Sequence, residues 1–272
     1  MKKILILGGS GFIGNSLYRE LNPYFDTYGT YFNENKYSKQ QNFFYFSLKE
    51  SNILSILKKV KPQLIISCLR GPFKEQLKCH EHLVTYIQNF NCRLMFLSSS
   101  NVFDAFEHYP SYEFDKTLSE SPHGRFKIRI ENSLLKLPPS RFVIARLPMV
   151  FGNNAPRTKE IEILVASNQP LEVFPNTIIN VTSDRKLSQQ IHYIINQKLT
   201  GIFHLGSVDL ITHFDFIRRI ILRRKLKGAI FKQIFTSNQM RYLAVLPKEN
   251  KLPSHLNVSY ESILEDLYLL KN

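Results

Sequence analysis

Three glycines separated by two residues each are the first candidates for chemistry in this chain. Gly8, Gly11 and Gly14 follow the apolar run 4–7, and an amphipathic segment of helical period comes directly after them. Glycines at such a turn let the backbone approach a diphosphate without a Cβ in the way, while the N-terminus of the following helix favours the anion. Gly9 offers a second pattern, Gly-x-Gly-x-x-Gly, in the same stretch. Either spacing predicts a dinucleotide site.

The elements that must position this turn are a strand before it and a helix behind it. Further along the chain, strand-like and helix-like segments alternate. Strands are predicted at 27–32, 64–68 and 93–97, and helices at 51–60 and 74–90. Ser51 is the candidate N-cap of the first of these helices. This order predicts an α/β fold of the Rossmann type, with a doubly wound parallel sheet whose ligand lies at the carboxyl ends of the strands.

Cofactor contacts are expected at the glycine turn and at the end of the second strand. At the turn we assign them to Gly8, Ser10, Gly11, Phe12, Ile13 and Gly14. The second strand should end near the adenosine ribose, where an acidic residue selects NAD and a basic one accommodates the 2′-phosphate of NADP. Glu34 fits the first case, whereas Asn33 with Lys36 fits the second. We favour NADP(H) and keep NAD(H) as the alternative.

The composition is that of an ordinary globular protein with a basic balance. The 272 residues are 43% hydrophobic and 21% charged, and no apolar run reaches the roughly 20 residues that cross a membrane. The formal net charge is +14, but the cations form short groups, the densest at 218–227. We therefore expect a solvated basic face and no nucleic-acid partner. Three scattered cysteines and separated histidines predict no disulfide framework and no metal site. A reducing cytoplasm is the expected location.

Four further motifs accompany the glycine turn. They are Ser-Ser-x-x-Val-Phe-Asp at 98–104, Pro-x-Tyr-Glu-x-Asp at 110–115, Pro-x-Gly-x-x-Lys-x-x-x-Glu at 122–131 and Arg-x-x-x-Val-Phe-Gly at 146–152. Together they resemble the extended short-chain dehydrogenase/reductase superfamily, and within it the dTDP-4-dehydrorhamnose reductase branch. The resemblance implies an NAD(P)-binding Rossmann domain over 1–152. It also implies a small C-terminal α/β substrate lobe over most of 153–272, with some segments returning to the first domain.

The resemblance also implies a function. We expect an NAD(P)-dependent reductase or epimerase-type oxidoreductase that acts on a nucleotide-activated 4-keto-deoxysugar in surface polysaccharide or related sugar biosynthesis. Its expected partners are the nucleotide-sugar substrate and a second copy of the chain in a homodimer. The alternative is a catalytically silent protein that binds a dinucleotide or nucleotide sugar and regulates or partners another enzyme.

In that superfamily a serine or threonine, a tyrosine and a lysine share the chemistry. The serine hydrogen-bonds the substrate oxygen, the tyrosine exchanges the proton, and the lysine lowers the tyrosine pKa and holds the nicotinamide ribose. The motif places Ser99 on the first of these positions and Lys127 on the last. His123 occupies the position of the tyrosine. The resemblance further assigns Cys68, at the end of the third strand, to the cofactor.

Three interpretations of His123 stay open. In the first, its imidazole is the general acid, with a pKa near 6.5 that Lys127 would lower by like-charge repulsion. In the second, Tyr109 or Tyr112 takes over the proton transfer. In the third, the chain has lost reductase chemistry and only binds its ligand. Tyr112 and Lys116 also satisfy Tyr-x-x-x-Lys literally, but they lie in a proline-flanked loop and open no apolar-periodic helix.

A few cations outside these motifs are candidates for phosphate contacts. Arg70 follows the third strand, and Arg157 or Lys159 lies at the start of the second lobe, where the segment 159–167 is expected to be helical. Cations are the natural partners of a diphosphate. The competing interpretation of each is a solvated surface position.

Overall fold

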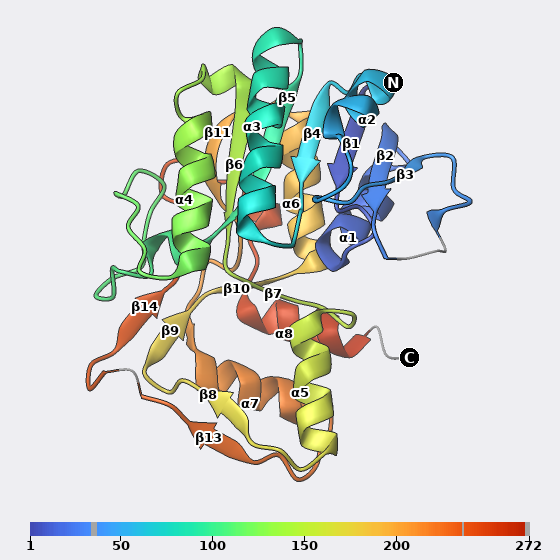
Figure 1. The fold of residues 1–272 in the computed structure, drawn as a ribbon. Coiled ribbons are helices and arrows are strands. Elements are labelled where there is room, and N and C mark those ends of the chain that lie inside the picture. The colour runs from blue at the N-terminus through green and yellow to red at the C-terminus, as the bar shows by residue number, and fades with distance from the viewer. Residues whose placement is uncertain (34–36, 236, 270–272) are drawn as a thin grey trace.

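A parallel sheet forms the centre of the larger domain (Figure 1). The computed structural model describes residues 1–33, 37–235 and 237–269. The strands of this sheet are β1 (Lys3–Leu7), β2 (Asp26–Tyr31), β3 (Phe43–Tyr45), β4 (Leu64–Ser67), β5 (Arg93–Ser99), β6 (Phe142–Leu147) and β11 (Gly201–His204). Their order is β11-β6-β5-β4-β1-β2-β3, and neighbouring strands are parallel throughout.

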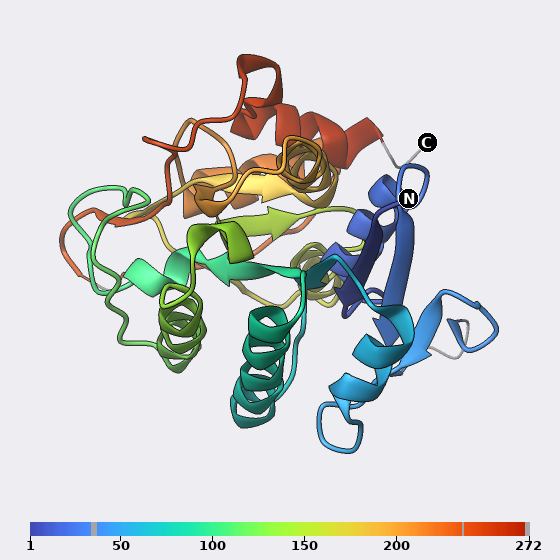
Figure 2. The same ribbon diagram turned by 90° about the horizontal axis from the view of Figure 1, so that it is seen from above.

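Helices cover both faces of the sheet (Figure 2). On one face lie α2 (Ile53–Val60), α3 (Phe73–Asn89) and α4 (Pro122–Leu134); on the other lie α1 (Phe12–Leu21) and α6 (Asp184–Asn196). Alternate residues of a strand point to opposite faces, so Leu5 and Leu7 of β1 pack with the first group, whereas Ile4 and Ile6 pack with the second. The predicted doubly wound parallel sheet of the Rossmann type is confirmed.

A smaller lobe lies beyond the carboxyl ends of the strands (Figure 1). Its strands are β7 (Met149–Phe151), β8 (Leu171–Val173), β9 (Thr177–Ile179), β10 (Val181–Ser183), β12 (Ile211–Thr212), β13 (Phe231–Gln233) and β14 (Arg241–Leu243). Its helices are α5 (Pro156–Ala166), α7 (His213–Arg223) and α8 (Tyr260–Leu269). Three short 3₁₀ segments are not confined to this lobe: η2 (Ser100–Phe103) follows β5, η3 (Pro139–Arg141) precedes β6, and η4 (Ser254–Leu256) precedes α8. Between the lobe strands the chain returns to the large domain and adds α6 and β11 to it.

Two helix starts differ from the sequence prediction by two residues or more. The N-cap of α2 is Asn52 rather than Ser51, and the Asn52 side chain accepts a hydrogen bond from an amide of the first turn at 3.0 Å. The Ser51 hydroxyl is occupied elsewhere, because it accepts from the Ser47 amide at 2.9 Å. The helix predicted from residue 159 begins at Pro156, since proline is well suited to the first helical position.

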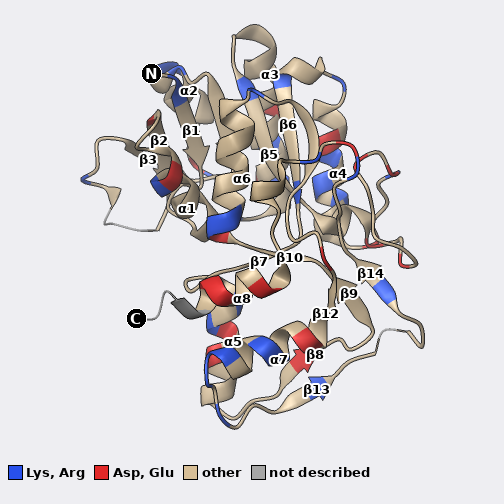
Figure 3. Cartoon of the chain, turned by 180° about the vertical axis from the view of Figure 1, so that it is seen from behind, with Lys and Arg blue, Asp and Glu red and all other residues tan. Residues whose placement is uncertain are grey.

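The densest group of cations, at 218–227, lies on the second half of α7 and just beyond its end, and acidic residues lie near it (Figure 3). Arg218 lies 3.2 Å from Asp215 one turn away. Glu261 of α8 pairs with both Arg219 and Arg223. This basic stretch is therefore part of the packing between α7 and α8. No helix in the part of the chain that the structure describes is both long and apolar enough to span a membrane.

Candidate active site

The glycine turn between β1 and α1 is closed by direct backbone packing. Gly8 has a φ of +78°, which side chains rarely adopt, and a Cβ there would lie 2.9 Å from the Cys68 carbonyl oxygen. A Cβ on Gly14 would lie 2.1 Å from the Gly8 carbonyl oxygen. Gly11 is the N-cap of α1 and provides no side-chain cap, so the first amides of this helix are left for a ligand. The turn therefore fits the diphosphate of a dinucleotide.

Both glycine spacings in the sequence describe the same packed turn. Gly9, which belongs only to the second pattern, would place a Cβ 2.9 Å from the Cα of Gly29 in β2. The Gly8 amide donates to Thr30 Oγ1 at 2.8 Å, and the Ser10 amide donates to the Thr30 carbonyl at 3.1 Å. The turn is thus held between β1, β2 and α1.

Gly14→Ala should destabilise the fold and weaken cofactor binding, because the backbones of the turn and of α1 must separate to admit a methyl group. We expect the free energy of unfolding to fall by about 1–3 kcal/mol, the usual range for overpacking, as measured by urea denaturation. Gly11→Ala is the comparison with a milder clash: its Cβ would lie 3.2 Å from the Gly8 carbonyl oxygen, which needs only a small shift, so this variant should lose less stability. Equal losses of stability in the two variants would contradict the packing argument.

A cleft of about 530 Å³ opens at the carboxyl ends of the central strands and reaches the small lobe. Most of the predicted site residues line it, namely Gly11, Phe12, Ile13, Gly14, Cys68, Ser99, His123 and Lys127. Gly8 and Ser10 shape the turn without lining the cleft, and Asn33 is exposed beyond the end of β2. Glu34 and Lys36 lie outside the described residues.

Lys127 directs its ammonium group towards the end of β5. Its Nζ donates to the Leu97 carbonyl at 2.8 Å and lies 4.6 Å from the centre of the Phe96 ring. Burial lowers the pKa of Lys127 to about 8, while Cys68 and Glu131 act in the opposite direction. An ammonium group has three donors, so two remain for a ligand after the carbonyl is satisfied.

The first turn of α4 brings His123 to the same cleft. Ser121 caps this helix by accepting from the Gly124 amide at 3.0 Å. His123 and Lys127 are four residues apart and therefore share one face of the helix. A Cβ on Gly124 would lie 2.2 Å from the Asn101 carbonyl oxygen. Glycine at this position thus lets α4 approach the segment that follows β5.

The surroundings of His123 favour its neutral imidazole. Partial burial lowers the pKa of His123 below 6.5; Lys127 lowers it further, Asp104 raises it and Arg70 again lowers it. Phe73 lies beside the ring, with the two ring centroids 6.1 Å apart. The neutral form accepts a proton, and the imidazolium form is a stronger acid than a phenol. His123 can therefore exchange a proton in either direction.

Ser99 is held at the end of β5 by Asn101, a residue that the sequence reasoning missed. Ser99 Oγ donates to Asn101 Oδ1 at 2.9 Å and accepts from the Asn101 amide at 3.2 Å. Asn101 also lines the cleft. The available signal was the Ser-x-Asn spacing after a strand, because short polar side chains commonly bond to backbone groups two residues away.

Glu131 of α4 and Arg146 of β6 form a buried ion pair beside the site. Their side chains are 1% and 2% exposed, and Arg146 Nη2 lies 2.8 Å from Glu131 Oε2. Ser98 Oγ donates to the same carboxylate. Arg146 Nη1 also donates to the Glu113 carbonyl at 2.8 Å. The pair therefore joins α4, β5 and β6 to the loop that precedes α4.

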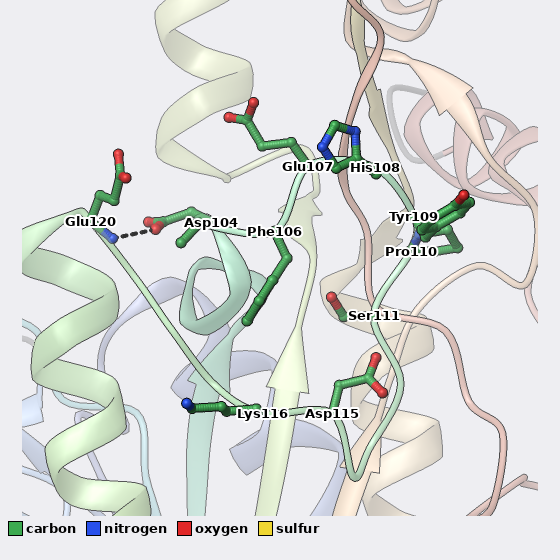
Figure 4. A pocket seen from close by; sticks show the side chains of 11 residues that line it. Asp104, Phe106, Glu107, His108, Tyr109, Pro110, Ser111, Asp115, Lys116 and Glu120 are labelled. Atoms are coloured by element: carbon green, nitrogen blue, oxygen red, sulfur yellow. Dashed lines mark hydrogen bonds between the residues drawn. The ribbon is translucent and has the colours of Figure 1, made fainter.

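A second cavity, of about 650 Å³, lies in the loop over 104–120 (Figure 4). Tyr109, which is 78% exposed, and Lys116 line it. Tyr112 packs against Lys248, whose Nζ lies 5.5 Å from the ring centre. No tyrosine among the described residues lines the cleft that holds His123. The arrangement therefore gives no support to Tyr109 or Tyr112 as the proton donor.

An uncapped glycine turn at the first strand–helix junction, with a cleft at the carboxyl ends of a parallel sheet, defines the class of Rossmann-type nucleotide-binding proteins. Residues 73–255 match the RmlD substrate binding domain family. The chain belongs to this family. No curated protein sequence matches the chain significantly.

Solved structures of sugar-nucleotide enzymes share the whole fold. The dTDP-4-dehydrorhamnose reductase of Bacillus anthracis, in complex with NADP, matches with a TM-score of 0.80 at 19% identity over 100% of both chains. The RfbD ortholog of Clostridium acetobutylicum, a dTDP-4-dehydrorhamnose reductase, has a TM-score of 0.74 at 20% identity, covering 99% of this chain and 100% of its own. The UDP-glucuronic acid 4-epimerase of Bacillus cereus, in complex with NAD, has a TM-score of 0.74 at 17% identity, covering 98% of this chain and 97% of its own. The predicted resemblance to the dTDP-4-dehydrorhamnose reductase branch is confirmed.

Proposed function

We propose that this chain is a nicotinamide-dependent oxidoreductase of nucleotide-activated sugars, with 4-keto-deoxysugars as its substrates. The observation that carries the proposal is the composition of one cleft. Ser99, His123 and Lys127 line it together with the uncapped start of α1. A helix end suited to a diphosphate and three groups suited to a reacting carbonyl thus share one cavity. Membership of the RmlD family and the names of the similar structures support the sugar-nucleotide chemistry.

The glycine turn and Lys127 are the groups that would hold the cofactor. Gly8 and Gly14 pack closely because they have no side chains, so the backbone of the turn is open to a ligand. No side chain caps the first amides of α1. When bound, a nicotinamide dinucleotide supplies or accepts a hydride. Lys127 keeps two ammonium hydrogens for the hydroxyls of the ribose. We propose NADP(H) as the cofactor, with NAD(H) as the alternative, since the similar structures include one with NADP and one with NAD.

Three side chains would then handle the substrate carbonyl. Ser99 turns its single hydroxyl hydrogen from Asn101 Oδ1 to the carbonyl oxygen and favours negative charge on it, while the Asn101 amide still donates to Ser99 Oγ. His123 in its imidazolium form gives a proton to that oxygen as the alkoxide forms, and it accepts the proton in the reverse direction. Lys127, with its pKa of about 8, remains mainly charged near neutral pH and stabilises the negative charge.

A second candidate is a catalytically silent protein that binds a dinucleotide or nucleotide sugar and partners another enzyme. The observation that favours it is the cleft lining, which contains no tyrosine in the described part of the chain. In this case the glycine turn still binds the cofactor, but His123 exchanges no proton with a substrate.

Cofactor binding and turnover separate the two candidates. The purified protein is titrated with NADPH and NADH while the nicotinamide fluorescence is followed. It is then mixed with dTDP-, UDP- and GDP-linked 4-keto sugars while oxidation of the reduced cofactor is recorded. We expect binding together with turnover of at least one sugar. Binding without turnover of any sugar would favour the silent protein. Failure to bind either cofactor would contradict the oxidoreductase and would leave only a silent protein that binds a nucleotide sugar.

A further inference from the structure

A short loop carries Arg70 from the end of β4 to the start of α3, and its backbone is fixed at both ends. The Cys68 amide donates to the Leu7 carbonyl of β1 at 2.9 Å. Gly71 has a φ of +141°, and its carbonyl accepts from Gln76 Nε2 at 2.7 Å. The loop therefore presents Arg70 from a defined position at the edge of the cleft.

Buried polar side chains of α3 and β4 also hold this loop in place through hydrogen bonds. Gln76 and His80 of α3 are both 3% exposed. His80 Nδ1 lies 2.7 Å from the Gln76 carbonyl, and its Nε2 lies 2.9 Å from Ser67 Oγ. Burial lowers the pKa of His80 to about 4, so the neutral ring donates from Nδ1 to the carbonyl and accepts from Ser67 at Nε2. A continuous set of hydrogen bonds thus connects the end of β4 to the base of the loop.

Arg70 lines the same cleft as His123 and has no acidic partner among the described residues. Its side chain is exposed, and within residues 1–33, 37–235 and 237–269 it forms no ion pair and no side-chain hydrogen bond. His123 lines the same cleft, and the charge of Arg70 lowers the pKa of His123. An anion bound by Arg70 would therefore share this cleft with the proposed proton donor.

The charge balance at this end of the cleft is positive. Lys127 and the N-terminus of α4 lie next to His123. Of the residues that the structure describes, three cations line the cleft, Arg70, Lys127 and Arg157, against the single carboxylate Glu160. Asp104, whose Oδ1 accepts from the Glu120 amide at 2.7 Å, lies outside this lining. In such a concave site the Arg70 guanidinium, which has no partner in the part of the chain that the structure describes, matches a carboxylate or phosphate with two parallel hydrogen bonds.

We propose that Arg70 binds an anionic group, a carboxylate or a phosphate, of the ligand that occupies the cleft beside His123. This inference rests on the proposed function and deepens it, because it concerns the ligand of the same cleft. The anion has two sources. One is the nucleotide sugar, either a carboxylate on the sugar ring or the diphosphate; the other is the diphosphate of the cofactor. If the anion is a ring carboxylate, Arg70 selects a uronic sugar over the neutral deoxysugar proposed above.

Calorimetric titration of the full chain with four ligands tests the inference. UDP-glucuronate and UDP-glucose differ only at the carboxylate of the sugar, whereas NADPH and NADH report on the cofactor. Arg70→Gln should raise the dissociation constant about tenfold for each ligand whose anion it binds. Lys74→Gln is the matched control, because Lys74 is an exposed cation of α3 that does not line the cleft. It should leave all four constants unchanged.

The pattern of losses identifies the source of the anion. A loss for UDP-glucuronate alone assigns Arg70 to the sugar carboxylate, an equal loss for both UDP sugars assigns it to their diphosphate, and a loss for NADPH and NADH assigns it to the cofactor. Unchanged constants in a variant that melts at the wild-type temperature, or a wild type that binds none of the four ligands, would overturn the inference. A wild type that binds the UDP sugars through Arg70 but neither cofactor would uphold it while refuting the oxidoreductase.

Discussion

Replacing His123 by alanine should lower kcat for carbonyl reduction about 10²- to 10⁴-fold, the contribution typical of a positioned general acid. The alkoxide that forms on the substrate needs a proton, and the imidazole of His123 lies on the wall of the cleft that also holds Ser99 and Lys127. KM should change little, since the imidazole acts in proton transfer rather than in binding. The measurement is steady-state oxidation of the reduced cofactor with the sugar that the turnover panel identifies.

Two further variants make this test specific. Arg129→Ala is the matched control, because Arg129 is an exposed residue of the same helix that does not line the cleft, and kcat should be retained. His123→Tyr places a phenol four residues before Lys127, and reductase turnover in this variant would indicate that the remainder of the site is intact. Undiminished turnover of His123→Ala would remove His123 from the mechanism.

The pH dependence of turnover should follow an imidazole rather than a phenol. Partial burial, Lys127 and Arg70 lower the pKa of His123 below 6.5, whereas the charge of Asp104 raises it. Because the imidazolium is the acid, kcat for reduction should rise as pH falls from about 8 through that pKa, whereas alcohol oxidation should rise with pH. Asp104→Asn removes the negative charge that raises the pKa of His123. It should therefore move the pH profiles of both reduction and oxidation to lower pH. A profile for reduction that is flat between about pH 5 and 7 would count against His123.

The parts of the site that could be predicted from the sequence depend on short-range patterns. The glycine turn needs only a strand, closely spaced glycines and a helix, and the alternation of apolar segments indicates the doubly wound sheet that the structure confirms. The spacing of His123 and Lys127, four residues apart, places them on one face of a helix, and the structure has both on α4. Their chemical roles remain predictions.

The parts that were missed depend on which of several nearby groups a short polar side chain binds. Asn101 binds Ser99 two residues away, and Gln76 binds the Gly71 carbonyl five residues away, but each side chain had other possible partners in the sequence. The strand β3 has only three residues, too few to show a period. Ser51 failed as an N-cap because the Ser47 amide takes its hydroxyl, which a propensity for capping cannot foresee.

Arg146→Met should lower the free energy of unfolding by about 3–5 kcal/mol, because it leaves the Glu131 carboxylate buried without its counter-ion. The pair is almost completely buried, and Arg146 also bonds the Glu113 carbonyl, so the loop before α4 loses an anchor as well. At about 2–4 °C per kcal/mol for domains of similar size, the melting temperature should fall by roughly 10 °C. Urea denaturation and thermal melting of the variant measure both quantities.

An exposed ion pair and a double variant show whether burial is the cause. Arg219 and Glu261 are 41% and 40% exposed, so Arg219→Met should cost no more than about 1 kcal/mol. Adding Glu131→Gln to Arg146→Met removes the unpaired buried charge while keeping an acceptor for Ser98. The double variant should recover a substantial part of the lost free energy of unfolding. If the double variant is less stable than Arg146→Met alone, the loss comes from packing around Arg146. Full stability in Arg146→Met would mean that the Glu131 carboxylate is satisfied by Ser98 or becomes protonated at little cost.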